Sequence, residues 1–410
     1  MRSQSTGPLS HVRVLDLSRI MAGPWAGQIL ADLGADVVKV ERPGSGDDTR
    51  AWGPPFLKGA DGSDTGEAAY YLSVNRGKRS IAIRLDTAEG QAIVRELACN
   101  SDILLENYKA GTLERFGLDQ ASLRQLNPRL VYCSVTGFGQ TGPRRDQPAY
   151  DFLIQAMGGL MSVTGECDGK PGGGPQKVGI PIVDLMTGMY AAVSVLAALA
   201  RRNETGQGDY IDIAMLDVQV ATLSNQAMNF LISGATPRRN GNAHPNIQPQ
   251  DVFACSDGDF ILVVGNDGQF GRLCKALGQP GWAEDARFAT NAQRVTHIEL
   301  LSGLLRAVFA RWRRADLIRA LDEAAVPCGA INSVPEVFDD PQVRQRGMLG
   351  RVPHPAGVDA PQLGSPMRFT DTPLGSMEAP PLLGQHCDEI LRELGYDAPR
   401  IEALRRKGIV

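Results

Sequence analysis

A glycine-rich stretch, VTGFGQTGPRRDQPAYD at Val135–Asp151, holds the first residues whose spacing suggests chemistry. Gly137, Gly139 and Gly142 have the G-x-G-x-x-G spacing of a dinucleotide-binding turn, in which the third glycine lies in a helix that binds the pyrophosphate. Pro143 follows the third glycine directly, and a second proline comes five residues later. No useful helix fits between two such prolines. The glycines therefore predict a flexible turn that lets the backbone lie close to a ligand.

Asp151 ends this stretch, directly before an apolar run that predicts a helix from about residue 150. A carboxylate in the first turn of a helix is stabilised by free N–H groups and by the helix dipole, so it stays ionised. An ionised aspartate can act as a nucleophile. The alternative is that it serves only as an N-terminal cap, and the residues alone favour the cap.

Strand and helix patterns alternate through the first half of the chain, and these elements must position the residues above. RVLDLS, the helix-forming GPWAGQILADLGA and DVVKVE make one compact βαβ unit at residues 13–41, which requires parallel pairing. Pro24 near the start of that helix and Gly34 at its exit fit the assignment. Further strands are predicted at 80–85, 102–107, 130–135 and 208–215, and helices at 87–99, 119–126, 150–164 and 181–203. The predicted class is α/β, with a Rossmann-like parallel sheet.

The middle of the chain has a different character. Residues 233–250 are rich in Gly, Pro and Asn and predict a loop, and DVFACSDGDFILVVG after it predicts a hairpin. Helical segments follow, and a terminal helix is predicted at Cys387–Leu394. We therefore expect a large domain built from residues 1–225 and 327–410, and a smaller α+β domain at 226–326.

Composition narrows the class of protein. At 410 residues with a formal charge of −4, the chain lacks the basic field that nucleic acid or an anionic membrane would attract. Its seven cysteines are scattered without zinc-like spacing, which favours reduced thiols in the cytoplasm and no metal site. The run from Leu185 to Ala200 is shorter than the ~20 residues of a membrane span and predicts a buried core helix. The first 13 residues predict a flexible leader, with a transit peptide as the alternative.

Five longer motifs resemble those of one family. They are VLDLSRIMAGPWAGQILADLGADVVKVERPGSGD, NRGKRSIAIRL, DILLENYKAGTLERFGLD, GQTGPRRDQPAYDFLIQAMGGLMSVTG and LLGQHCDEILRELGY, in this order along nearly the whole chain. They resemble the class III CoA-transferases, the group of formyl-CoA transferase and carnitine CoA-transferase. The resemblance implies a CoA thioester as substrate, no separate cofactor, and an intertwined homodimer. It also implies that Asp151, in the Tyr150–Asp151 pair, is the nucleophile that attacks the acyl-CoA.

The resemblance also implies which residues bind CoA. The predicted contacts are basic or amide side chains in three of these motifs: Arg42, Lys78, Arg79, Asn107 and Arg115. The 3′-phosphate and pyrophosphate of CoA need cations, and arginine binds phosphate through paired N–H groups. The alternative for each basic residue is a solvated surface charge, which is the usual position of such side chains.

Departures from the family pattern point to the substrate. Met21, followed by Ala22, stands where the formyl-CoA transferases carry a glutamine near the acyl group, which weakens a formyl or oxalate role. The loop that covers the active site in the family corresponds here to Arg239–His244, with Gly241 and Asn242. This pattern is similar to the branch that uses succinyl-CoA and a small dicarboxylate such as glutarate, itaconate, malate or mesaconate.

Two residues of that loop are candidates for contacting the acid. Arg239 is the predicted cation for the carboxylate that does not react, because an unpaired buried charge is costly. Its alternative is a solvated loop charge. His244 is predicted either to assist the acceptor carboxylate or to be a turn residue before Pro245.

Two other kinds of enzyme share features of this chain. The α-methylacyl-CoA racemases share the family's fold but carry histidine before their aspartate, where this chain has Tyr150. A nicotinamide-dependent oxidoreductase would use the same βαβ pattern, and the broken glycine motif counts against it. CoA transfer is therefore the predicted activity, with racemisation and hydride transfer as the alternatives.

Overall fold

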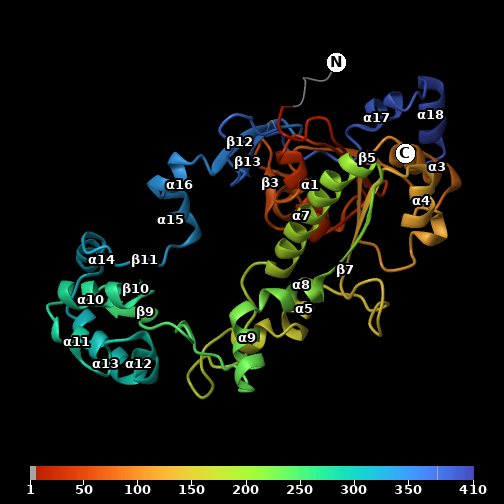
Figure 1. Cartoon of the computed structure of the whole chain (residues 1–410). Coiled ribbons are helices and arrows are strands. Elements are labelled where there is room, and N and C mark those ends of the chain that lie inside the picture. The colour runs from red at the N-terminus through yellow and green to blue at the C-terminus, as the bar shows by residue number, and fades with distance from the viewer. Residues whose placement is uncertain (1–5, 376) are drawn as a thin grey trace. The chain divides into compact units, whose positions relative to one another are not determined.

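The computed structural model of the protein describes residues 6–375 and 377–410, so the first five residues of the predicted leader lie outside it. The chain groups into two compact units (Figure 1). Unit 1 consists of Met1–Gly159, Gly179–Ser224 and Pro341–Val410, and unit 2 of Leu160–Val178 and Asn225–Asp340. Unit 2 contains the region of the predicted small domain together with residues 160–178 and 327–340. Both units are therefore built from segments that are distant in the sequence.

A six-stranded parallel sheet forms the centre of unit 1. Its strands are β1 (Arg13–Asp16), β2 (Asp36–Glu41), β5 (Lys78–Ala82), β6 (Ile103–Glu106), β7 (Val131–Thr136) and β8 (Tyr210–Ala214). They pair in the order β5-β2-β1-β6-β7-β8. This doubly wound order places the usual ligand crevice where the winding reverses, between β1 and β6. The predicted parallel sheet is confirmed.

Helices cover both faces of this sheet (Figure 1). They are α1 (Ala22–Asp32), α3 (Ala88–Cys99), α4 (Gln120–Leu126), α7 (Ile182–Thr205), α17 (Cys387–Glu393) and α18 (Ala398–Arg406). Two further helices, α5 (Asp151–Met157) and α8 (Met215–Thr222), pack against each other and against α7. Strand side chains alternate between the faces: Ile103 and Leu105 join the core cluster of α1 and α7, whereas Leu104 joins that of α3 and α17. The C-terminal helices thus complete a core that begins at the N-terminus.

One predicted helix is divided in the structure. The sequence predicted a continuous helix over residues 150–164, but α5 ends at Met157 and α6 (Leu160–Val163) lies in unit 2. Gly159, between them, has φ of 86°, a left-handed conformation that favours glycine. A Cβ on Gly158 would lie 2.3 Å from Cγ of Gln219 in α8. This glycine pair therefore ends α5 and lets α8 approach closely.

The long helix α7 is buried along one side. By length and composition it could cross a membrane, with a mean hydropathy of 1.8. In unit 1, its residues Ala191 and Val195 are fully buried in the cluster shared with α1 and the sheet. Met189 and Val193 on another side are exposed. The predicted core helix is therefore confirmed for one face only.

Unit 2 contains the predicted hairpin, in a three-stranded antiparallel sheet of β9 (Gln250–Cys255), β10 (Gly258–Val263) and β11 (Cys328–Ala330). Phe253, Phe260 and Phe309 pack together in its core. Its helices are α6, α9 (Ser224–Ser233), α10 (Asp267–Ala276), α11 (Gly281–Glu284), α12 (Asn291–Thr296), α13 (Ile298–Phe309), α14 (Arg314–Glu323) and α15 (Val334–Asp339).

Unit 1 also holds α2 (Ala69–Leu72), α16 (Pro341–Gln345) and the strand pairs β3 (Phe56–Lys58) with β4 (Asp64–Ala68) and β12 (Leu349–His354) with β13 (Val358–Leu363).

Candidate active site at the carboxyl ends of the parallel strands

Two cavities that share Arg19 and Tyr108 open where β1 and β6 end. The first, which we call the large cavity, has a volume of about 630 Å³, and the second, the small cavity, about 210 Å³. Arg19 follows β1 and Tyr108 follows β6. In a doubly wound sheet, ligands bind outside the carboxyl ends of the strands at the point where the winding reverses. Both cavities lie at that point.

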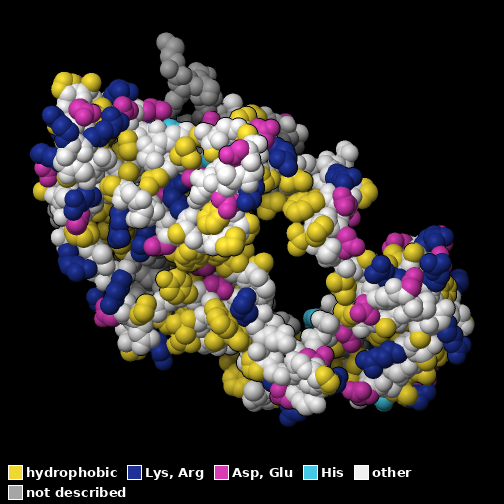
Figure 2. Space-filling model, turned by 180° about the vertical axis from the view of Figure 1, so that it is seen from behind, with side chains coloured by type: hydrophobic (Ala, Val, Ile, Leu, Met, Phe, Trp, Pro, Cys, Tyr) yellow, Lys and Arg dark blue, Asp and Glu magenta, His cyan; other side chains and the backbone are white. Residues whose placement is uncertain are grey.

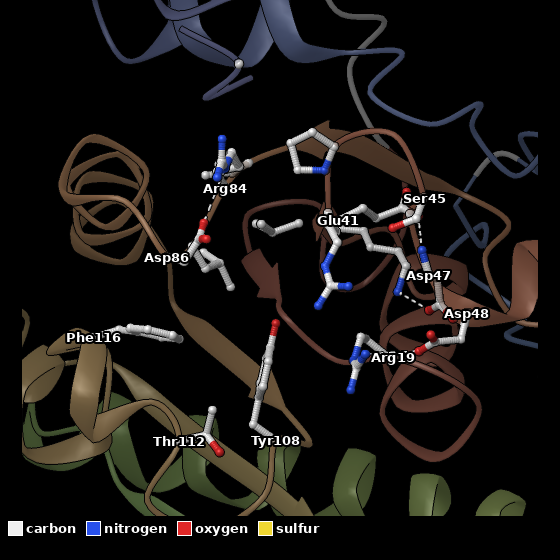
Figure 3. Close-up of a pocket in the computed structure, with 18 residues that line it drawn as sticks. Arg19, Glu41, Ser45, Asp47, Asp48, Arg84, Asp86, Tyr108, Thr112 and Phe116 are labelled. Atoms are coloured by element: carbon white, nitrogen blue, oxygen red, sulfur yellow. Dashed lines mark hydrogen bonds and ion pairs between the residues drawn. The ribbon is translucent and has the colours of Figure 1, made fainter.

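The large cavity combines cations with aromatic rings (Figure 3). Arg19, Arg42 and Arg84 are among its lining residues. Tyr108 and Phe116 bring rings to one side of it. Guanidinium groups bind phosphate through paired N–H donors, and aromatic rings stack on nucleobases. The lining is therefore suited to a ligand that has both phosphate groups and a base.

Arg42 is the cation of this lining that lacks an acidic partner. Arg19 Nη1 lies 3.0 Å from Asp48 Oδ2, and Arg84 Nε lies 3.4 Å from Asp86 Oδ1. Arg42 is exposed at the end of β2, and no hydrogen bond or ion pair from residues 6–375 and 377–410 reaches its guanidinium group. The charge of Arg42 is thus available to a ligand, and its predicted contact with CoA stays a prediction.

Asn107 and Arg115 take different positions from Arg42. Asn107 holds the backbone of Arg19 on both sides, because its Oδ1 accepts from the Arg19 N–H at 2.8 Å and its Nδ2 donates to the Arg19 carbonyl at 2.7 Å. Arg115 is exposed and lines neither cavity, whereas Thr112 and Phe116 beside it line the large one. Asn107 therefore holds the backbone of Arg19 in place at the cavities. Arg115 is a neighbour of lining residues in the sequence but does not line either cavity itself.

Lys78 and Arg79 line neither cavity, and their predicted contact with CoA stays a prediction. Both lie at the amino end of β5, whereas the cavities open at the carboxyl ends of the strands. Lys78 is fully buried, and its Nζ lies 2.9 Å from Oδ2 of Asp16. Arg79 pairs with Asp36 at 2.9 Å and with Glu393 at 3.0 Å. Internal ion pairs engage both cations, because an unpaired buried charge would be costly.

The loop between β1 and α1 is strained at the entry to both cavities. Ile20 has φ of 72°, a left-handed conformation that is rare for a β-branched residue. The Asp47 carboxylate accepts from the Ile20 N–H at 3.2 Å, and Lys39 Nζ lies 2.9 Å from the same carboxylate in a fully buried pair. Burial alone would raise the pKa of Asp47, but the charge of Lys39 outweighs it and lowers the pKa to about 2. The Lys39–Asp47 pair was not predicted from the sequence. Its signal was a lysine inside a strand of a parallel sheet, because both faces of such a sheet are buried and the charge needs a partner.

Three predicted substrate residues come together at the small cavity. Met21, Ala22 and Tyr150 all line it. Met21 and Ala22 begin α1, whose first turn has no side-chain cap. Such a helix start attracts anions through its free N–H groups and its dipole. The small cavity is thus suited to a carboxylate, and the contacts of these three residues with substrate stay predictions.

Asp151 joins the starts of two helices. It is the first residue of α5, and its Oδ1 accepts from the backbone N–H groups of Val183 at 2.8 Å and Asp184 at 3.3 Å in the first turn of α7. Its Oδ2 accepts from Nε2 of Gln155 at 2.6 Å. Asp151 therefore does have a capping role, as the sequence allowed, but the helix whose N–H groups it caps is α7. Its role as the nucleophile stays a prediction.

Asp184 is a buried carboxyl group beside Asp151. It lines the small cavity and is only 8% exposed. Burial, and then the negative charge of Asp151, raises the pKa of Asp184 to about 7. Burial together with these two aspartates also raises the pKa of Tyr70 to about 12. From the sequence, Asp184 was the next candidate for the nucleophile after Asp151, and that role stays a prediction.

Asp184→Asn should stabilise the protein more at about pH 8 than at about pH 4. The pKa of Asp184 lies at about 7 in the folded protein, against an ordinary value of 3.8. Between these values the folded state keeps a proton that the unfolded chain releases, so the free energy of unfolding falls as the pH rises from about 4 to about 7. Asparagine does not titrate, so the variant should gain about 2–4 kcal/mol relative to wild type over this range. Urea unfolding at several pH values measures this gain.

Asp217→Asn is the matched control for this measurement. Asp217 is an exposed aspartate in the first turn of α8, which also packs against α7. Its substitution should change the free energy of unfolding by less than about 0.5 kcal/mol at either pH. A gain for Asp184→Asn that is equal at both pH values would contradict titration of Asp184 near neutrality.

The predicted acceptor loop lies in unit 2, where Arg239 is already paired. Arg239 forms an ion pair with Asp168, whose side chain is 80% exposed, and donates to the Ser162 carbonyl at 3.2 Å. Gly241 has φ of 60°, and its N–H donates to the Gly165 carbonyl at 3.2 Å. The segment around Asp168 is thus held against the segment around Arg239, and the predicted contacts of Arg239 and Gly241 with an acid stay predictions.

The two other predicted residues of this loop differ from each other. Asn242 is exposed. His244 Nδ1 accepts from the backbone N–H groups of Asn246 and Ile247, each at 3.1 Å, so Nδ1 carries no proton and the ring is used in the turn. The turn alternative for His244 is therefore present, with Nε2 left as the ring atom that contact with an acid would use.

Comparisons with known proteins identify the family of this chain. Residues 9–387 match CoA-transferase family III. A succinate–glutarate CoA-transferase of Agrobacterium fabrum is 50% identical over 94% of this chain and 96% of that protein. A succinyl-CoA:mesaconate CoA-transferase of Haloarcula marismortui is 39% identical over 95% and 97%. The crystal structure of a CAIB/BAIF family protein from Brucella suis covers 95% of this chain and 100% of that chain, with 48% identity and a TM-score of 0.81. The predicted family is confirmed: the chain belongs to CoA-transferase family III.

Proposed function

We propose that this protein transfers CoA from succinyl-CoA to a small dicarboxylic acid. One relative above is named for succinate and glutarate and the other for succinyl-CoA and mesaconate, so both are named for dicarboxylates. The observation that carries the proposal is the pair of cavities that share Arg19 and Tyr108. An acyl-CoA has a phosphorylated nucleotide at one end and a reactive thioester at the other. The large cavity has the cations and rings that suit the nucleotide, and the small cavity has the helix start that suits the acyl end.

In this proposal, the nucleotide end of CoA occupies the large cavity and the acyl end occupies the small one. Arg42 provides an unpaired cation for a phosphate, and Tyr108 and Phe116 provide rings for the adenine. The uncapped start of α1, at Met21 and Ala22, faces the acyl end with free N–H groups. Backbone N–H groups at such a position stabilise the oxyanion that forms when a thioester is attacked.

The transfer itself needs an aspartate and no further cofactor. An aspartate oxygen attacks the thioester carbonyl, and CoA thiolate leaves a mixed anhydride behind. The thiolate then attacks the aspartyl carbonyl of the anhydride, which releases the free acid and leaves an aspartyl-CoA thioester. The incoming carboxylate attacks that thioester, which releases CoA thiolate and forms a second mixed anhydride. The thiolate then attacks the acyl carbonyl of this anhydride, which yields the new acyl-CoA and frees the aspartate. Each bond that forms replaces one that breaks, so the steps need no redox partner.

Two aspartates compete for the role of nucleophile. The family resemblance nominates Asp151, whose carboxylate accepts three hydrogen bonds and follows Tyr150 at the small cavity. Hydrogen bonds to a carboxylate make it a weaker nucleophile. Asp184 is the second candidate, because its carboxyl group lines the same cavity beside Tyr150 and is only 8% exposed.

A panel of acids tests the proposed function. The purified protein would be incubated with succinyl-CoA and glutarate, itaconate, malate or mesaconate, and the acyl-CoA products identified by mass spectrometry. Valerate, which has the chain length of glutarate and one carboxylate fewer, is the control acid. We expect transfer to at least one dicarboxylate and little to valerate. Faster transfer to valerate than to every dicarboxylate would exclude the proposed substrate class.

Arg42→Ala should raise the KM for succinyl-CoA by about tenfold to a hundredfold and leave kcat within about threefold. The loss of one hydrogen bond to a charged group has an effect of this size, and Arg42 contacts a part of CoA that does not react. Steady-state kinetics with succinyl-CoA varied at saturating acid measures both constants. Arg115→Ala removes the same charge outside both cavities and should change the KM less than about threefold. Equal effects of the two substitutions would mean that Arg42 is not the phosphate contact.

We propose further that the protein works as a homodimer. Large hydrophobic side chains are exposed on unit 1 in α5, α7 and α8: Phe152, Leu153, Met157, Met189, Tyr190, Val193 and Val220. Figure 2 shows hydrophobic side chains gathered on the surface around α5 and α8. Exposed apolar surface of this kind is usual where another chain packs. Sedimentation that yields only monomer at micromolar concentration would refute the dimer.

A further inference from the structure

The loop between β1 and α1 contains a residue with a strained backbone. Ile20 has φ of 72°. Among residues 6–375 and 377–410, Ser224 and Ala325 are the other non-glycine residues with positive φ, and neither is β-branched. A β-branched residue in the left-handed region is a genuine outlier. Such a conformation persists only where the surrounding structure holds it, and it is commonest at functional sites.

Two side chains that form one buried ion pair hold this loop by its backbone. The Ile20 N–H donates to the Asp47 carboxylate, at 3.2 Å from Oδ1 and 3.3 Å from Oδ2. Lys39 Nζ donates to the Ser18 carbonyl at 2.8 Å and lies 2.9 Å from Asp47 Oδ2. We call Lys39 and Asp47 the anchoring pair. One partner holds residue 18 and the other holds residue 20, so the pair restrains the loop at two points.

Further contacts fix Asp47 in place. Its carboxylate accepts from the Thr49 N–H at 3.0 Å and from Thr49 Oγ1 at 2.8 Å. Its own N–H donates to Glu41 Oε2 at 3.0 Å, and that carboxylate is paired with Arg50 at 2.8 Å. Asp47 therefore cannot follow the loop if Ile20 relaxes, and relaxation would break the hydrogen bond between them.

The strained loop carries groups that line both cavities. Arg19 lines both of them, and Ile20 and Met21 line the small one. Rotation of φ at residue 20 changes the direction of the chain between Arg19 and Met21. Because α1 is fixed in the core through Ala22 and Ala26, such a rotation would move Arg19 relative to the start of α1. The left-handed conformation of Ile20 therefore keeps both groups at the cavities.

We infer that Lys39 and Asp47 are positioning residues for CoA transfer, because the anchoring pair holds Ile20 in its left-handed conformation and so keeps Arg19 and the first turn of α1 at the cavities. This inference rests on the proposed function, in which these groups face the two ends of an acyl-CoA. Both side chains of the pair are fully buried, so they act through the loop. Glycine adopts the left-handed conformation at no steric cost. Glycine at position 20 should therefore make the anchoring pair dispensable for activity.

The first test removes the anchoring pair and measures whether glycine at position 20 restores transfer. Lys39→Met/Asp47→Ala removes both charges, so neither partner is left as an unpaired buried ion. Its kcat/KM for succinyl-CoA, with glutarate as acceptor, should fall about fivefold to thirtyfold, the scale set by the cost of a left-handed non-glycine residue. Adding Ile20→Gly should return kcat/KM to within about threefold of wild type, whereas adding Ile20→Ala should not.

Thermal melting tests the strain without an assay of activity. In the otherwise wild-type protein, Ile20→Gly should melt about 2–4 °C above Ile20→Ala, because only glycine relieves the strain. In the Lys39→Met/Asp47→Ala background this difference should disappear, because the loop is free to relax. An anchoring pair that only stabilises the core would leave the same difference between glycine and alanine in both backgrounds.

Asp32→Asn/Arg76→Met is the matched control, because it removes a buried ion pair at the other end of α1. Arg76 Nη2 lies 2.5 Å from Asp32 Oδ2, and neither residue lines the large or the small cavity. This variant should keep kcat/KM within about threefold of wild type at a temperature where it is folded.

The outcomes separate the inference from the proposed function. Wild-type kcat/KM in Lys39→Met/Asp47→Ala, no rescue by glycine, or equal rescue by glycine and alanine overturns the inference while CoA transfer stands. Absence of transfer to any dicarboxylate by the wild type overturns the proposed function instead, and the melting comparison still tests the anchoring pair. Should Lys39→Met/Asp47→Ala fail to fold, the comparison of Ile20→Gly with Ile20→Ala decides, and equal melting temperatures overturn the inference.

Discussion

Replacing one aspartate by asparagine, at Asp151 or at Asp184, is expected to lower CoA transfer at least about a thousandfold without lowering the melting temperature. Asparagine keeps the size and the hydrogen-bonding capacity of aspartate but cannot form the anhydride. The other substitution should cost less than about tenfold. The family resemblance places the large loss at Asp151, and Asp184, which lines the small cavity, is the second candidate. Transfer assays and thermal melts of both variants measure the two effects.

Chemical trapping identifies the reacting carboxylate independently of the rates. Hydroxylamine added during turnover converts an aspartyl thioester or anhydride to a stable hydroxamate, which peptide mass spectrometry locates. The label should lie on the same aspartate whose substitution abolishes transfer, and it should require an acyl-CoA. Full activity in both variants, or a label on another residue such as Asp168, would show that neither candidate is the nucleophile.

The fold of unit 1 was predictable because its signals are local. β2 was predicted at its observed bounds, since the three valines of DVVKVE favour a strand that follows the turn at Gly34. The helix over 150–164 was wrong at Gly158 and Gly159, where the break depends on the approach of α8, a contact distant in the sequence. α18 was missed, although Asp397 as its N-cap and a proline in its first turn were visible.

The candidate site was predictable only in part. Met21, Ala22 and Tyr150 come together at the small cavity, as expected for residues that follow β1 and β7 in a parallel sheet. Arg19 and Tyr108 line both cavities and were missed, because their importance depends on which strands are neighbours. A motif gives the type of a side chain and the strand it belongs to. It does not show whether an internal partner already engages the charge.

Lys78 is a predicted CoA contact whose charge is engaged by an internal partner, and its loss is expected to have a large effect on stability. Lys78→Met should lower the free energy of unfolding by about 3–5 kcal/mol, because it leaves the fully buried carboxylate of Asp16 without its cation. Lys78 Nζ also donates to the Pro24 carbonyl at 2.9 Å and to Asn75 Oδ1 at 3.0 Å, so the start of α1 loses a further contact. Urea unfolding of the variant and of the wild type measures the difference.

The double variant Asp16→Asn/Lys78→Met separates a structural role of Lys78 from a direct contact with CoA. Removing both charges leaves no unpaired ion in the core, so the double variant should recover most of the stability that Lys78→Met loses. At a temperature where the variants are folded, their KM for succinyl-CoA should stay within about threefold of wild type, unlike that of Arg42→Ala. A raised KM with unchanged stability would restore Lys78 to the CoA site. Burial at the amino end of β5 makes the opposite result the expected one, because the cavities open at the other end of the sheet.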